Sequence, residues 1–69
     1  MKPDARYLIV KDIYVEDRDL TIKKGGLLTR THGCYYLEGG LLDSYFQGQF
    51  DRLIDYEAEN GFNYLKELY

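Results

Sequence analysis

Apolar and polar residues alternate over residues 20–23, which read Leu-Thr-Ile-Lys. This period of two predicts a half-buried β-strand. The next three residues, Lys24-Gly25-Gly26, predict a tight turn, because glycine reaches positive φ without steric strain. Residues 27–29, Leu-Leu-Thr, resume the apolar pattern. Residues 19–30 therefore predict a strand, a turn and a second strand.

Turn signals recur every 7 to 10 residues along the rest of the chain. This spacing is typical of a small all-β barrel or meander. The other predicted segments, in chain order, are a long or bent strand at residues 6–15, a polar loop at 16–19, a turn at 31–33, a strand at 34–37, a turn at 38–40, an apolar segment at 41–46 and a final run at 50–56.

The C-terminal segment departs from the strand pattern. Phe62, Leu65 and Tyr69 recur at helical spacing, and Asn60 is a residue type that caps helix N-termini. We therefore expect a short helical tail at residues 60–69. Such a short helix is unstable alone in water, so its apolar stripe should cover the barrel or a second subunit. A twofold dimer through Phe62, Leu65 and Tyr69 is one expected arrangement.

Composition places the chain among small folded domains. It has 69 residues, 45% of them hydrophobic, with eight tyrosines and no tryptophan. A chain of this length buries only about 60% of its unfolded surface, so it holds a small core and no deep catalytic cavity. The single cysteine, Cys34, excludes an internal disulfide. Without a signal-like or membrane-spanning apolar run, we expect a cytoplasmic protein that does not insert into membranes.

The order of these segments resembles a Src-homology-3 (SH3)-like barrel. Residues 20–28 resemble that family's strand and diverging turn, and residues 34–37 correspond to its paired aromatic strand. Residues 43–46 resemble its short helical turn, and residues 7–10 would form the first strand. The resemblance implies a mostly all-β fold, a barrel of about five short antiparallel strands over residues 6–56 of a single domain. The chain lacks the tryptophan of that family's peptide groove, so the resemblance implies the barrel and not binding of Pro-rich peptides. Many small phage and bacterial proteins resemble such a barrel.

Catalytic and metal-binding patterns are weak in this sequence. His32 precedes Gly33 in a predicted turn and has no partner in sequence for general-base chemistry. Cys34 lies in an aromatic strand, where a free cysteine acts as a small hydrophobe. Gly25-Gly26 and Gly39-Gly40 fit hairpin turns and lack the flanking residues of a phosphate-binding loop. We predict no enzyme activity, no cofactor and no metal site.

Charge is unevenly distributed along the chain. Residues 1–30 carry seven Lys and Arg against five Asp and Glu, and residues 31–69 carry two against seven. The acidic residues concentrate beside Tyr56. The sequence predicts a partner-binding surface made of Asp51, Asp55, Tyr56, Glu57 and Glu59, which would attract a basic protein.

Three functions follow from this pattern. The first is a non-catalytic protein-binding module with an acidic, tyrosine-rich surface. The second is an acidic, DNA-mimicking inhibitor of a basic host protein, of the kind that small phage proteins often provide. The third, disfavoured by the pI near 4.9, is weak nucleic-acid binding through Lys23, Lys24 and Arg30. The core is expected to contain seven apolar residues: Leu8, Val10, Leu20, Ile22, Leu28, Tyr36 and Leu53.

Overall fold

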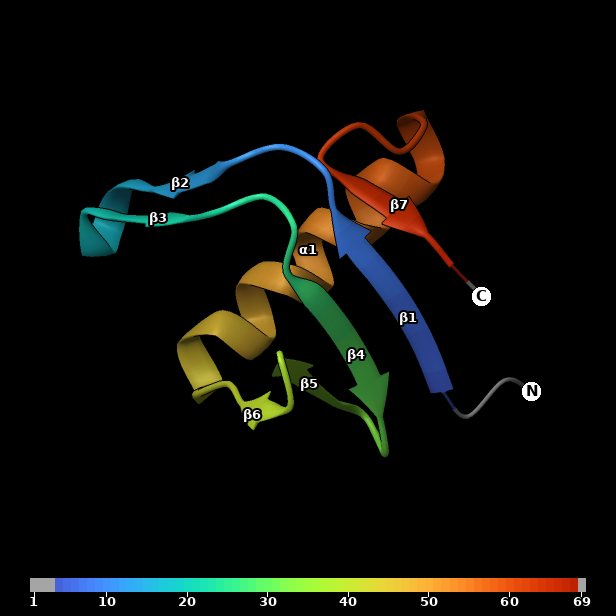
Figure 1. The fold of residues 1–69 in the computed structure, drawn as a ribbon, viewed down its shortest axis with the longest axis horizontal. Helices are drawn as coiled ribbons and strands as arrows, with labels where there is room; N and C mark the ends of the chain where they lie inside the picture. Colours follow the sequence, from blue (N-terminus) through green and yellow to red (C-terminus); the bar gives the residue numbers. More distant parts are fainter. Residues whose placement is uncertain (1–3, 69) are drawn as a thin grey trace.

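The computed structural model describes residues 4–68. Its elements are β1 (Asp4–Ile9), β2 (Ile13–Val15), a 3-10 turn η1 (Glu16–Arg18), β3 (Leu20–Ile22), β4 (Leu27–Thr31), β5 (Cys34–Leu37), β6 (Gly40–Leu41), α1 (Ser44–Asn60) and β7 (Leu65–Glu67). Five strands form one antiparallel sheet in the order β6-β5-β4-β1-β7, and β2 and β3 form a separate ribbon. In Figure 1, α1 crosses behind the sheet and the β2–β3 ribbon extends to one side as an arm.

The first four strands belong to one long, bent hairpin. Leu8 pairs with Leu27 in the sheet and Ile13 pairs with Ile22 in the arm, so the same register continues across the bend. The predicted long or bent strand at residues 6–15 and the polar loop at 16–19 are confirmed. The predicted pairing of residues 20–23 with residues 27–29 is wrong, because β3 pairs with β2 and β4 pairs with β1.

Gly25 and Gly26 therefore lie at the bend and not in a hairpin turn. Gly25 has a φ of 98°, a conformation that favours glycine. Its N–H donates to the Ile9 carbonyl, while the Ile9 N–H donates to the Gly26 carbonyl, and these bonds hold the two sides of the hairpin together. The glycines correctly indicated a residue with positive φ, but this conformation occurs at a bend within a hairpin as well as in a tight turn.

The turns on either side of β5 agree with the sequence. His32 and Gly33 both have positive φ, as do Glu38 and Gly39. Two consecutive residues with positive φ define the type I′ turn, whose twist matches that of a two-residue hairpin. These turns make β4, β5 and β6 a meander. The sheet is not closed into a barrel, since β6 and β7 end it on opposite sides. Residues 4–68 form a small β-rich domain with one α-helix.

The helix occupies residues that were predicted to continue the β-pattern. Asp43 caps its N-terminus by accepting a hydrogen bond from the Phe46 N–H at 3.1 Å. Phe46, Phe50 and Leu53 follow at spacings of four and three, which places them on one face toward the sheet. The predicted run at residues 50–56 is therefore part of a 17-residue helix.

The predicted helical tail at residues 60–69 is wrong. Asn60 is the last residue of α1, and Gly61, with a φ of 100°, ends the helix. Residues 65–67 form β7 beside β1, and the Leu68 N–H extends this pairing by donating to the Arg6 carbonyl at 2.8 Å. Long-range pairing with β1 outweighs the local helical spacing.

The predicted dimer stripe is not formed within the described residues. Leu65 is buried in the core, with 1% of its surface exposed. Phe62 is partly exposed, and its ring centroid lies 6.1 Å from that of Tyr7. Tyr69 lies outside the described residues.

The core lies between the sheet and α1. Its buried members are Tyr7, Ile9, Leu28, Tyr35, Phe50 and Leu65. Of the predicted core, Leu28 is confirmed, and Leu8, Ile22, Tyr36 and Leu53 are half-buried. Val10 and Leu20 are 37% and 44% exposed, so their placement in the core was wrong. Tyr7 and Ile9 are buried instead, so the face of β1 opposite to the predicted one turns inward.

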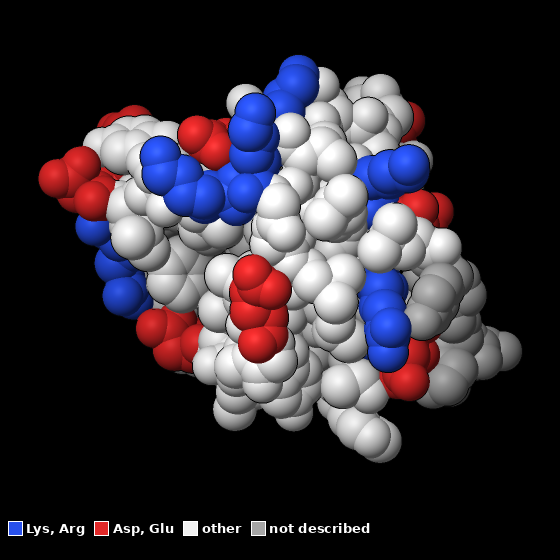
Figure 2. All heavy atoms as spheres, viewed as in Figure 1, with Lys and Arg blue, Asp and Glu red and all other residues white. Residues whose placement is uncertain are grey.

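The other face of the sheet has no helix over it among the described residues. This face is turned toward the viewer in Figure 1. In Figure 2 several basic side chains lie close together at the upper left, further basic side chains lie on the right part of the surface, and one acidic group lies nearer the middle among uncharged residues.

Candidate functional site

The outward face of α1 carries a row of carboxylates. Asp51, Asp55 and Glu59 follow at intervals of four residues, so they lie on one side of the helix, with a rise of about 6 Å between neighbours. All three are exposed. Tyr56 stands beside the row with 65% of its surface exposed. We call Asp51, Asp55, Tyr56 and Glu59 the acidic helix face.

Asp51 anchors this face to the core. Its Oδ1 accepts a hydrogen bond of 2.8 Å from the hydroxyl of Tyr35, whose ring is buried under the helix. Burial, together with the hydrogen bond and the negative charge of Asp51, raises the pKa of Tyr35 far above its ordinary value. Within residues 4–68, no ion pair involves Asp55 or Glu59. Their charges therefore face solvent and are free to act on a partner.

Glu57 does not belong to the acidic helix face, contrary to the sequence prediction. It points into the molecule and is 2% exposed. Its carboxylate accepts backbone N–H bonds from Asn63 at 3.1 Å, Tyr64 at 3.0 Å and Leu65 at 3.2 Å. Since residue 57 follows Phe50 and Leu53 at helical spacing, it falls on the inner face. It ties the end of α1 to the start of β7.

A second polar side chain fixes the start of the helix. Gln47 Oε1 accepts from the Tyr35 N–H at 2.6 Å, and Gln47 Nε2 donates to the carbonyls of Tyr35 and Leu42, both at 3.0 Å. The Gln47 amide thus replaces a neighbouring strand for part of β5. Together with Glu57, it fixes α1, and with it the acidic helix face, on the sheet.

The predicted basic patch is not assembled. Lys23 and Lys24 lie at the bend before β4, whereas Arg30 lies near the other end of that strand. The Arg30 guanidinium carbon is 5.9 Å from the centroid of the Tyr35 ring, on the α1 side of the sheet. The Lys23 Nζ lies 3.9 Å from Asp12 Oδ2, so the negative carboxylate offsets part of the positive potential around Lys23.

His32 and Cys34 lie on either side of Gly33 at the junction of β4 and β5. His32 is exposed in its turn, and Cys34 is half-buried at the start of β5. Among residues 4–68, no three His, Cys, Asp or Glu side chains gather in a way that could hold a metal ion. In the same part of the chain, no helix has the length and apolarity needed to cross a membrane.

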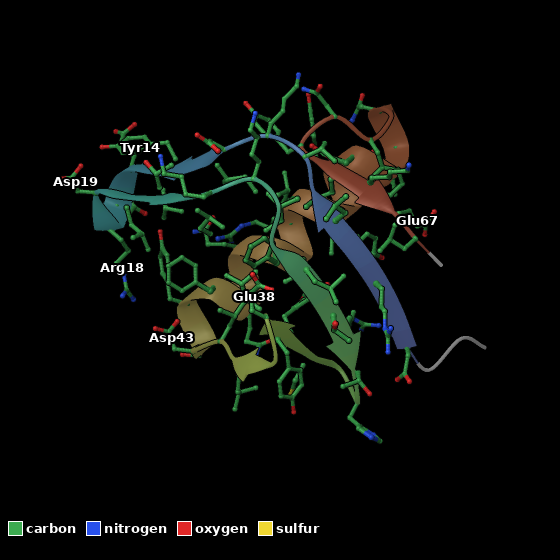
Figure 3. All side chains as sticks on the ribbon, in the orientation of Figure 1. Tyr14, Arg18, Asp19, Glu38, Asp43 and Glu67 are labelled. Atoms are coloured by element: carbon green, nitrogen blue, oxygen red, sulfur yellow. The ribbon has the colours of Figure 1, made fainter. Side chains whose placement is uncertain are left out.

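Sequence reasoning missed a groove between the arm and the first half of α1. Its volume is about 280 Å³, and its lining is mostly apolar, with Ile13, Val15, Ile22, Phe46 and Leu53 among the wall residues. The tip of the arm bridges to the helix: Tyr45 donates to Asp17 at 3.1 Å, and Arg18 lies 4.0 Å from Asp43. Figure 3 shows Arg18 pointing from the arm tip toward Asp43. No local sequence signal marks this groove, because its walls are 20 or more residues apart in the chain.

Comparisons with known proteins give no match: no protein-family model, curated protein or solved structure matches this chain. The resemblance to the SH3 family stays a prediction.

Proposed function

We propose that this protein is a non-catalytic protein-binding module, and that the acidic helix face binds a basic segment of its partner. The observation that carries the proposal is the row of Asp51, Asp55 and Glu59 beside the exposed ring of Tyr56. Exposed carboxylates speed encounter with a cationic surface, and an exposed tyrosine supplies contact area with little loss of side-chain entropy. The rigid attachment of α1 through Gln47 and Glu57 lowers the entropic cost of binding.

An ordinary protein partner fits this surface better than a DNA-binding site does. The three carboxylates extend over about 12 Å of helix, whereas double-stranded DNA carries one negative charge per about 1.7 Å. Arg52 lies within the same exposed stretch and lowers the net charge further. The acidic helix face therefore has too low a charge density to favour mimicry of DNA. Nucleic-acid binding is disfavoured because Lys23, Lys24 and Arg30 do not form one patch.

The proposal is tested with two short fluorescent peptides of equal length, one rich in Lys and Arg and one in which Glu replaces those residues. Fluorescence anisotropy measures binding at low and at physiological salt. We expect the basic peptide to bind with an affinity that falls as salt rises, since exposed charges are screened over about 10 Å at 0.1 M.

Charge-reversal variants locate the binding surface. Asp55→Lys should weaken binding of the basic peptide by about tenfold or more. Glu67→Lys is the matched control, because it makes the same change of net charge on an exposed residue of β7, outside the acidic helix face. Equal losses in both variants would mean that only net charge matters and would contradict the proposal, as would absence of binding by the wild type at low salt.

A further inference from the structure

The face of the sheet opposite α1 presents side chains that the core does not use. Because successive residues of a strand point to opposite sides, the strands that bury Tyr7, Leu28 and Tyr35 toward the helix send their other residues outward. We call the resulting surface the open sheet face. Its residues are Arg6, Leu8, Leu27, Thr29, Tyr36, Leu41, Lys66 and Leu68, together with Glu38 in the turn after β5.

These residues form two rows across the strands. In the first row, Lys66 is paired with Leu8, Leu8 with Leu27, and the Glu38 N–H donates to the Leu27 carbonyl at 2.9 Å. This row therefore has a cation at one end, two leucines in the middle and an acid at the other end. Figure 3 labels Glu38 beside β4.

The second row has apolar side chains at both ends and polar ones in the middle. Leu68 lies next to Arg6, Arg6 is paired with Thr29, Thr29 with Tyr36, and Tyr36 with Leu41. Leu41 and Leu68 are 64% and 42% exposed. An exposed apolar surface of this kind, bordered by charges, is typical of an interaction site.

We propose that the open sheet face binds a second copy of this chain in a face-to-face twofold dimer. The axis would lie between the two sheets, parallel to the strands and over the line between β1 and β4. A half-turn about this axis places the β7 side of one sheet over the β5 side of the other. In the first row, Lys66 then faces Glu38 of the partner subunit, and Leu8 faces Leu27 of the partner subunit.

The same operation brings Leu68 over Tyr36 of the partner subunit and Arg6 over Thr29 of the partner subunit. The Lys66 cation therefore meets an acid, the leucines meet apolar groups and Arg6 meets a polar hydroxyl, which is the self-complementarity that a twofold interface requires. Because of this charge pattern, we infer that the open sheet face binds a second copy of the chain and not an unrelated partner.

The area of the open sheet face limits how tightly two copies can bind. The four strands that overlap, β5, β4, β1 and β7, lie about 4.8 Å apart and give a face of roughly 19 by 17 Å, or about 320 Å² per subunit. This is below the roughly 800 Å² per partner of a standard stable interface. We therefore expect a dimer with a micromolar dissociation constant. The acidic helix face would remain free on the outer side of each subunit.

The test measures molar mass by sedimentation equilibrium from micromolar to millimolar concentration. The wild type should shift from monomer to dimer over this range. Lys66→Glu and Glu38→Lys should each raise the dissociation constant by about tenfold or more, because the twofold axis makes both pairs repulsive. The double variant, in which the two charges are exchanged, should dimerise like the wild type. Arg52→Glu on α1 is the matched control and should have no effect.

Three results would overturn the proposal. The first is a wild type that remains monomeric at millimolar concentration. The second is a dimer that both single variants leave intact, since the interface would then lie elsewhere. The third is a double variant that dimerises no better than the single variants, because Lys66 would then not face Glu38 of the partner subunit. Circular dichroism of each variant confirms that the exposed substitutions leave the fold unchanged. The peptide-binding result of the proposed function is independent of all three.

Discussion

Replacing Glu57 by alanine should destabilise this domain more than replacing any other acidic residue. The substitution removes the carboxylate that accepts the backbone N–H groups of Asn63, Tyr64 and Leu65. These residues connect α1 to β7, and all three N–H groups donate to the same Glu57 carboxylate. The loss therefore affects the helix end, the connecting loop and an edge strand of the sheet together.

The magnitude follows from the burial of the three bonds. The bond from Leu65 is buried, so its unsatisfied N–H costs about 1–3 kcal/mol. The bonds from Asn63 and Tyr64 are partly buried, and water replaces them in part, so each contributes about 0.5–1.5 kcal/mol. The total is about 2–6 kcal/mol. A domain of this size has an unfolding free energy of about 3–10 kcal/mol, so the variant loses a large share of its stability.

Glu57→Gln separates the hydrogen bonds from the packing of the side chain. Oε1 accepts from Asn63 and Leu65, and Oε2 accepts from Tyr64. A glutamine that keeps its oxygen at the Oε1 position retains two bonds and sets an N–H₂ group against the Tyr64 N–H. We therefore expect a loss smaller than that of Glu57→Ala but still above about 1 kcal/mol.

Urea unfolding followed by far-ultraviolet circular dichroism measures these differences, with Glu59→Ala as the matched control. Glu59 is exposed, so its replacement should change the unfolding free energy by no more than about 0.5 kcal/mol. Hydrogen exchange of the Leu65 amide should accelerate in Glu57→Ala. The reasoning is refuted if Glu57→Ala is as stable as Glu59→Ala, or if Gln and Ala at position 57 have equal effects.

Three further predictions concern the core and the helix. Ile9→Ala should cost about 2–5 kcal/mol in urea unfolding and Val10→Ala clearly less, and the reverse order would mean that the other face of β1 is buried. Because the folded-state pKa of Tyr35 is raised above its ordinary value of 10.0, stability is full below pH 10 and falls as pH rises further. In the Tyr35→Phe variant, the unfolding free energy should decrease less above pH 10 than in the wild type. An unchanged dependence on pH would contradict this prediction. Gly48→Ala should stabilise the domain by about 0.5–1 kcal/mol, since a Cβ there meets no neighbouring atom within 4 Å; a lower thermal midpoint would exclude this.

The strands and turns around β4 and β5 could be predicted from sequence because their signals are local. His32-Gly33 and Glu38-Gly39 require positive φ at both positions, and a two-residue turn then fixes the pairing of the strands beside it. The choice of partner for β3 is a long-range property. Residues 20–22 fit either the following strand or the preceding one, and only the continuous register with β1 and β2 decides between them.

The helix was missed because its apolar face is short and its second turn contains Gly48, a poor helix former. Asp43 was the available signal, since an aspartate three residues before Phe46 is typical of a helix start. The acidic helix face was predicted in part. Asp51, Asp55, Tyr56 and Glu59 share an exposed surface, but Glu57 could be recognised as buried only after residues 50–56 were assigned to a helix.

The most direct test of the proposed binding surface is an NMR titration of the ¹⁵N-labelled protein with the Lys- and Arg-rich peptide. Binding at the acidic helix face should give the largest backbone shift changes at Asp51, Asp55, Tyr56 and Glu59, and raising the salt concentration should diminish these changes. Shift changes concentrated on the open sheet face or in the groove between the arm and α1, with α1 residues 51–59 unaffected, would contradict this prediction.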